Sequence, residues 1–148
     1  MNPPRQATLD DIPAIIEIRR RSFFAAMPMM PVLHTNEEDV AFYSDVVLPS
    51  TNLWLVENEN LAIGFIAYRD GWIEQLYIDP SHQRRGLGAK LVALAKVRNT
   101  SLNLWTFQCN QPARSFYEKH DFKVCKMTDG SDNEEHQPDI LYTWINLQ

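Results

Sequence analysis

One segment, residues 72–97, constrains the fold more than the rest of the chain, because two glycines separate a strand-like pattern from a helical one. Residues 72–78 are mainly aromatic, aliphatic and β-branched, and Asp79-Pro80 ends the run, as is typical of a strand. Beyond the glycines, helical spacing is shown by Leu87, Leu91 and Leu94. The segment therefore predicts a strand, a short loop that contains Gly86 and Gly88, and a helix.

The loop has the features of an anion-binding site. Glycines let a ligand approach the backbone closely, and the first amides of a helix have no partner within the helix. The helix dipole adds a partial positive charge, and Arg84, Arg85 and Lys90 add full ones. The pattern predicts that main-chain N–H groups hold a phosphate or pyrophosphate. It differs from a P-loop, which has Gly-Lys-Ser/Thr, and from a Rossmann fingerprint, which has a third glycine.

The loop resembles the acyl-CoA-binding motif of the GCN5-related N-acetyltransferase (GNAT) family, Gln/Arg-x-x-Gly-x-Gly/Ala. Gln83-Arg-Arg-Gly86-Leu-Gly88 matches every defined position of that motif. Further on, Asn110-Gln-Pro-Ala113-Arg-Ser-Phe116-Tyr117 is similar to the family's second signature, a helix followed by a phenylalanine, here Phe122, that starts the next strand. The two motifs follow one another in the family's order and extend from Trp72 to Phe122.

The resemblance implies an α+β (α/β) fold, the acyl-CoA N-acyltransferase (GNAT) fold. Its mixed, mostly antiparallel central sheet has about seven strands flanked by about four helices. The fourth and fifth strands, here about 73–78 and 102–107, are expected to splay apart. A chain of 148 residues fits one such domain, 1–148.

The resemblance also implies acetyl-CoA as co-substrate. Unpaired backbone groups at Leu76, Tyr77 and Ile78 would bond its pantetheine arm, and Asn110 would contact the arm from the end of the opposite strand. The pyrophosphate would lie against the loop residues Gln83, Arg84, Arg85, Gly86, Leu87, Gly88 and Ala89.

The reaction implied is direct attack of a neutral amine on the thioester. It needs an oxyanion donor, a proton acceptor and an acid for the departing thiolate. A backbone N–H near Ile78 would be the donor. Tyr117, at the position of the motif tyrosine, would be the acid, because a phenol with a pKa near 10 keeps its proton at neutral pH.

The proton acceptor is less clearly marked. Trp72 and Trp105 occupy the two positions at which relatives carry a glutamate, and neither can accept a proton. Strand alternation places Glu74 on the same face as Trp72, so Glu74 is the candidate base, acting directly or through a water. A structural ion pair is the alternative role for this carboxylate.

Composition excludes several other classes. The 14 basic and 19 acidic residues give a formal charge of −5, which disfavours a general nucleic-acid or anionic-membrane binder. No apolar run approaches the roughly 18 residues that span a bilayer, and the N-terminus has no signal-like core, so we expect a cytoplasmic protein. Cys109 and Cys125 are too few and too far apart for a paired-cysteine metal site, and no metal is expected.

The remaining chain predicts the other elements. A Thr8-x-x-Asp11 capping box starts a first helix, whose arginine run 19–21 is interpreted as a solvated face. A second helix, 36–47, should end before Pro49. Further strands are expected at 5–8, 52–57, 61–68, 123–128 and 139–145.

Two loops carry open alternatives. The methionine loop (residues 27–34) contains two prolines, and its methionines could line an acceptor pocket or simply fill the core. The acidic loop (residues 129–138) would lie over the acceptor side. It could attract a cationic amine, form an ordinary solvated hairpin or, with His136, bind a metal.

Two functions fit these observations. The first is an acetyl-CoA-dependent N-acetyltransferase that acts on a primary amine of a small molecule or peptide, as a monomer or homodimer. The second is a non-catalytic acyl-CoA-binding or regulatory module, which the tryptophans at both usual glutamate positions favour.

Overall fold

The computed structural model describes residues 2–147, which form a seven-stranded sheet with helices around it. The strand order is β1-β2-β3-β4-β5-β7-β6, and all neighbouring pairs are antiparallel except β4 and β5, which are parallel. The strands are β1 (Arg5–Gln6), β2 (Asn52–Asn58), β3 (Leu61–Arg69), β4 (Trp72–Ile78), β5 (Ser101–Phe107), β6 (Lys123–Thr128) and β7 (Asp139–Ile145). The predicted mixed, mostly antiparallel sheet is confirmed.

Four helical segments flank the sheet within the described part of the chain, as predicted. They are α1 (Ile12–Ala26), α2 (Asn36–Phe42) with its continuation through the π-helical η2 (Tyr43–Val47) into α3 (Leu48–Ser50), α4 (Leu87–Val97) and α5 (Gln111–Lys119), with short 3-10 turns η1 (Leu9–Asp11) and η3 (Pro80–His82). No helix in residues 2–147 is long and apolar enough to cross a membrane.

The second helix is longer than the sequence predicts. It continues past Pro49 to Ser50, so the expected end before the proline is wrong. The π-helical turn η2 widens the backbone just before Pro49, which accommodates the missing N–H and the ring in the last turn.

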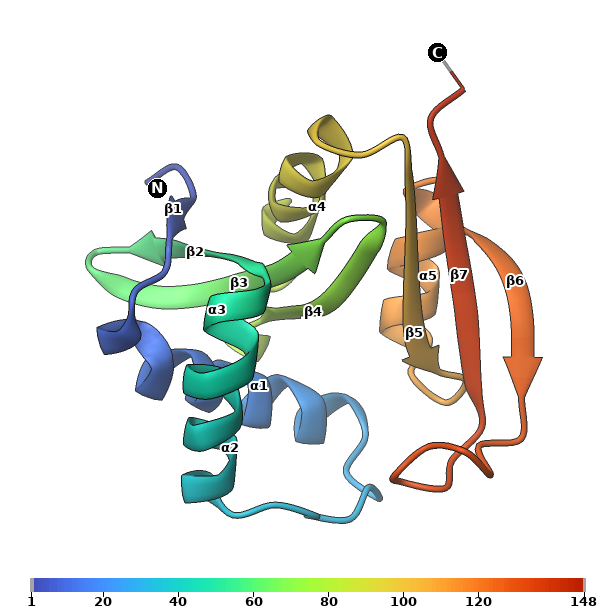
Figure 1. The fold of residues 1–148 in the computed structure, drawn as a ribbon, viewed down its shortest axis with the longest axis horizontal. Coiled ribbons are helices and arrows are strands. Elements are labelled where there is room, and N and C mark those ends of the chain that lie inside the picture. Colours follow the sequence, from blue (N-terminus) through green and yellow to red (C-terminus); the bar gives the residue numbers. More distant parts are fainter. Residues whose placement is uncertain (1, 148) are drawn as a thin grey trace.

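Helices cover both faces of the sheet (Figure 1). On one face, α1 and η2 pack against β2 and β3 through a cluster that includes Ile15, Tyr43 and Phe65. On the other face, α4 and α5 share a single larger cluster with strands from both halves of the sheet, represented by Leu91 and Tyr142. Burial of these side chains is the main stabilising contribution, at roughly 1.5–3 kcal/mol for each large apolar residue.

The sheet opens between β4 and β5. These strands pair at Trp72 and Asn103, where the Asn103 N–H donates to the Gly71 carbonyl at 2.8 Å, and no further pair follows along the described strands. Figure 1 shows β2, β3 and β4 running across the view while β5, β7 and β6 stand upright, so the two halves diverge beyond this bridge. The predicted splay between the fourth and fifth strands is confirmed.

The arginine run on α1 is only in part the solvated face that the sequence predicts, because Arg21 is exposed while Arg19 and Arg20 are half-buried. Arg20 forms an ion pair with Asp39 of α2 at 2.8 Å, and Arg21 lies 3.2 Å from Asp79 at the end of β4. Both carboxylates are buried, and a buried charge requires a counter-ion. The run therefore fastens α1 to its neighbours.

The N-terminal strand is held by an ionic network. Arg5 donates hydrogen bonds to both carboxylate oxygens of Asp11 at 2.9 Å and to Glu57 on β2 at 2.9 Å. The expected capping box is present, because the Thr8 N–H donates to Asp11 at 2.8 Å. Arg5 holds the pKa of Asp11 down at about 2, through its hydrogen bond more than through charge alone.

Replacing this carboxylate should therefore destabilise the fold in a pH-dependent way. Asp11→Asn is expected to lower the free energy of unfolding by about 1–2 kcal/mol near neutral pH. Because folding depresses the pKa of Asp11, the contribution is complete above its ordinary value of 3.8 and disappears as pH falls towards 2. Urea unfolding across this pH range measures the difference. Asp10→Asn, which alters an exposed neighbour, is the control, and equal effects of both variants would contradict the prediction.

Candidate functional site

The glycine loop (residues 83–89) presents free amides at the start of α4. Gly86 is the N-cap of α4 and has φ +78°, a left-handed conformation that glycine adopts without strain. The Lys90 N–H donates to the Gly86 carbonyl at 3.2 Å, at the start of the helix. No close hydrogen bond joins the N–H groups of residues 84–89 to another described residue, so a ligand can engage them.

Positive charge surrounds these amides. Arg84 and Arg85 are exposed, and neither they nor Lys90 forms an ion pair within residues 2–147. The Gln83 side chain points back to β4 and donates to the Ile78 carbonyl at 3.1 Å. The loop is thus tied to the open edge of β4, while its cations and amides can meet an anion.

The two sequence motifs touch each other. A Cβ atom on Gly88 would lie 2.9 Å from the Phe116 ring, so the absence of a side chain at this position allows α4 to approach α5. Asn110 caps α5, because its side chain accepts a hydrogen bond from the Ala113 N–H at 3.2 Å. Beyond the other end of α5, Asp121 has a left-handed backbone conformation, with φ +70°.

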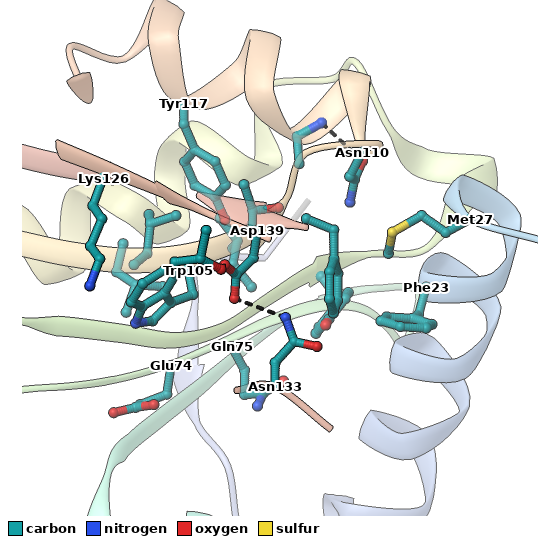
Figure 2. Close-up of a pocket in the computed structure, with 18 of the residues that line it drawn as sticks. Phe23, Met27, Glu74, Gln75, Trp105, Asn110, Tyr117, Lys126, Asn133 and Asp139 are labelled. Atoms are coloured by element: carbon teal, nitrogen blue, oxygen red, sulfur yellow. Dashed lines mark hydrogen bonds between the residues drawn. The ribbon is translucent and has the colours of Figure 1, made fainter. Parts of the chain in front are cut away.

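A cavity of about 480 Å³ lies between the splayed strands (Figure 2). Its walls come from β4, β5 and the first residue of β7, and it is closed by side chains of α1, α5, β6 and the acidic loop. The residues that line this cavity include Phe23, Met27, Glu74, Gln75, Leu76, Tyr77, Trp105, Phe107, Asn110, Tyr117, Lys126, Thr128, Asp132, Asn133 and Asp139. The structure therefore brings Tyr117, Glu74, Leu76, Tyr77 and Asn110 to one cavity, whereas residues 83–89 and Ile78 lie outside its lining.

Tyr117 extends from α5 into the cavity and is 7% exposed. Burial raises the pKa of its phenol well above the ordinary value, and the nearby Tyr77 adds to the shift. Tyr77, which lines the same cavity, also has a pKa raised by burial. Both phenols therefore keep their protons throughout the neutral range.

Glu74 borders the cavity but already has a partner. Its carboxylate accepts a hydrogen bond from Arg69, the ion-pair role that the sequence left open. A β-bulge leaves Glu74 without a partner on β3, because Ala67 pairs with Gln75 and Tyr68 with Ile73. The Arg69 guanidinium carbon also lies 5.7 Å from the centre of the Trp72 ring, so Trp72 and Glu74 both interact with this guanidinium.

The two loops of uncertain role meet beside the cavity. In the methionine loop, Met27 and Met30 are buried, and Met27 lines the cavity as well, so both expected roles apply to it. The acidic loop contributes Asp132 and Asn133 to the cavity lining. This position agrees with the expectation that the loop covers one side of the site. His34 of the first loop forms an ion-pair contact with Glu134 of the second.

Several lining residues carry no motif signal. Thr128, Asn133 and Asp139 meet because β7 pairs with both β5 and β6. That register is not visible in local spacing, and the only sequence hint is an aspartate directly after Pro138. Cys109, next to the start of α5, is an exposed free cysteine. Within residues 2–147, no group of three or more His, Cys, Asp or Glu side chains is placed to hold a metal ion.

Comparison with known proteins agrees with this geometry. Residues 49–124, just over half of the chain, match the family model described as an acetyltransferase (GNAT) domain. The chain therefore belongs to the GNAT acetyltransferase family.

Relatives match along nearly the whole chain. Peptidyl-lysine N-acetyltransferase YiaC of Escherichia coli is 28% identical over 147 residues, 97% of each chain. The solution structure of apo-form YjaB from Escherichia coli superposes with a TM-score of 0.76 at 25% identity, covering 95% of each chain. The PaiA N-acetyltransferase of Thermoplasma acidophilum, crystallised with coenzyme A, has the same fold, with a TM-score of 0.73 at 20% identity over 98% of this chain and 99% of that one.

The contact between the motifs can be tested by stability. Gly88→Ala should lower the free energy of unfolding by about 1–3 kcal/mol, because the new methyl group overlaps the Phe116 ring. Phe116→Leu shortens that neighbour, so the double variant should lose less than the sum of the single changes. Thermal or urea unfolding of all four proteins gives the coupling. Strict additivity would show that Gly88 and Phe116 do not constrain each other.

Proposed function

We propose that this protein transfers an acetyl group from acetyl-CoA directly to a primary amine. The observation that carries the proposal is that two stretches of backbone with unpaired hydrogen-bonding groups lie next to each other. One is the set of free amides at the start of α4, and the other is the edge of β4 that β5 leaves unpaired beyond Trp72. Together they suit a ligand with a diphosphate at one end and an amide-containing arm.

The residues present fit acetyl-CoA. The amides of residues 84–89, with Arg84 and Arg85, would hold the diphosphate, while Gln83 keeps the loop against β4. Backbone groups at Leu76, Tyr77 and Ile78 would bond the arm, and Asn110 would meet it from the end of β5. When bound, acetyl-CoA supplies an activated acyl group whose thioester would lie in the gap between the strands.

The chain's own groups then meet the demands of acyl transfer. An amide of β4 near Ile78 would stabilise the oxyanion that forms when the amine nitrogen attacks the thioester carbon. As the carbon–sulfur bond breaks, Tyr117 would give its proton to the departing thiolate, and the amine proton would leave through Glu74 or a water beside it. The raised pKa of Tyr117 keeps the phenol protonated until that step. The products are an acetamide and free coenzyme A.

A peptide lysine is the acceptor best supported. YiaC, which matches 97% of the chain, is named a peptidyl-lysine N-acetyltransferase. A cavity of about 480 Å³ would receive one extended side chain, with the methionine loop and the acidic loop at its margin. We extend the lysine assignment to this chain as part of the proposal.

A non-catalytic acyl-CoA-binding module is the second candidate. It is favoured because Trp72 and Trp105 occupy both positions at which the family resemblance would place a glutamate that acts as the base, while Arg69 pairs with Glu74. Such a module would use the same loop and strand gap without turnover.

Thiol release separates the two candidates. Acetyl-CoA is incubated with a panel of lysine peptides, polyamines and arylamines, and free coenzyme A is measured with a thiol reagent. The proposal expects release that depends on at least one amine, with mass spectrometry showing the acetylated product. Calorimetry measures coenzyme A binding in parallel. Binding without turnover on any amine would establish the module instead, and absence of binding would refute both.

Tyr117→Phe tests the acid. The variant should reduce kcat by about 100-fold or more, because general acid catalysis typically contributes this much, while coenzyme A affinity stays within a few-fold. Tyr68→Phe is the matched control, since it removes a hydroxyl from a buried tyrosine that does not line the cavity. An unchanged kcat for Tyr117→Phe would remove Tyr117 from the mechanism.

A further inference from the structure

The cavity contains three carboxylates, and they differ in what neutralises them. Glu74 is paired with Arg69, and Asp132 is exposed to solvent. Asp139 is half-buried, and within residues 2–147 it forms no ion pair with a basic side chain. Partly buried charges are stabilised by opposite charges, and Asp139 is the half-buried carboxylate of the cavity that has no ion-pair partner among these residues.

Neutral donors hold the Asp139 side chain in place. Thr128 donates its hydroxyl hydrogen to Oδ1. Asn133 donates Nδ2–H to Oδ2 at 3.1 Å (Figure 2). Asn133 is itself fixed by two hydrogen bonds with the backbone of Gln137, at 2.7 and 3.2 Å. A carboxylate has about four acceptor positions, so roughly two remain free for a ligand. The charge is oriented but not compensated.

The surroundings suit a linear alkylammonium. Asp139 pairs with Phe107 across β5 and β7, which places it at the end of β5 where the strands are parted. Apolar side chains line the same cavity, chiefly Phe23, Met27 and Phe107, and Trp105 adds an aromatic surface. Such walls can cover methylene groups, and an indole face attracts a cation. The other charged side chains in the lining are Glu74, Lys126 and Asp132.

We propose that Asp139 is the acceptor-binding carboxylate, which receives the ammonium group of a primary alkylamine such as a lysine side chain before that amine loses its proton. This assignment rests on the proposed acetyl transfer and specifies its acceptor. Neither motif predicts it. Asp139 selects charged amines and orients them, so that Thr128 and Asn133 act through it as positioning residues.

Equilibrium binding tests the proposal without requiring turnover. Nα-acetyl-lysine methylamide and Nα-acetyl-norleucine methylamide differ at the ammonium group and are titrated into the protein with and without coenzyme A. The wild-type protein should prefer the lysine compound by about 10- to 100-fold, the size of a charge-assisted hydrogen bond. Asp139→Asn should abolish the preference and leave coenzyme A affinity within about twofold.

Asp129→Asn is the matched control, because Asp129 begins the acidic loop that leads into β7 but does not line the cavity. It should keep the full preference for lysine. A preference that survives Asp139→Asn, or a wild-type protein that shows none, would overturn the proposal. If the lysine compound binds but no thiol is released, the proposed acetyl transfer is refuted while the Asp139 assignment stands. The same conclusion follows if the lysine compound binds but coenzyme A does not.

A crystal structure of the wild-type protein with coenzyme A and the lysine compound gives a second measurement, should Asp139→Asn fail to fold. The proposal requires the ammonium nitrogen within hydrogen-bonding distance of the Asp139 carboxylate. An ammonium bound instead to Glu74 or Asp132 would overturn it.

Discussion

The contact between β4 and β5 at Trp72 and Asn103 is the constraint on which the site depends. The Asn103 N–H donates a hydrogen bond to the Gly71 carbonyl, and the Asn103 side chain accepts one from the Thr143 hydroxyl. The contact between β4 and β5 is therefore also connected to β7. Beyond it, the strands turn away from one another and the backbone on that side of β4 stays unpaired. Unpaired backbone groups are costly in a buried sheet. Here they border a cavity, where a ligand or water can satisfy them.

Packing on the far face of the sheet keeps this gap open. α4 and α5 belong to one hydrophobic cluster that reaches both halves of the sheet, and Gly88 lets the two helices approach closely at Phe116. The same helices carry the free amides of the glycine loop and the phenol of Tyr117. One packed layer therefore fixes the distance between the glycine loop and the phenol of Tyr117.

The open side of the cavity is organised by charge. Arg20 and Arg21 neutralise the buried Asp39 and Asp79, and Arg69 neutralises Glu74. These pairs leave Asp139 as the half-buried carboxylate with only neutral donors among the described residues. In the proposed acetyl transfer, this unpaired negative charge beside the strand gap would discriminate between charged and neutral side chains of the acceptor.

Much of the fold could be predicted from local sequence. The glycines between a strand and a helix, the Asn110 cap and the positions of seven strands follow from short-range spacing, because backbone conformation and amphipathic pattern are set within a few residues. The motif resemblance supplied the splay and the family. Pro49 misled the prediction, since a π-helical turn is not encoded by the proline itself.

The arrangement of side chains around Asp139 was decided by tertiary structure. Asp139 faces the cavity because β7 inserts between β5 and β6, and Thr128 and Asn133 reach it from segments 11 and 6 residues away in sequence. Glu74 is held by Arg69 through a bulge that alternation does not reveal. The sequence by itself determined where two glycines open the backbone at the start of α4, because that depends on neighbouring residues. Which carboxylate lacks a counter-ion depends on every strand and helix packed around it, and only the folded chain settles that.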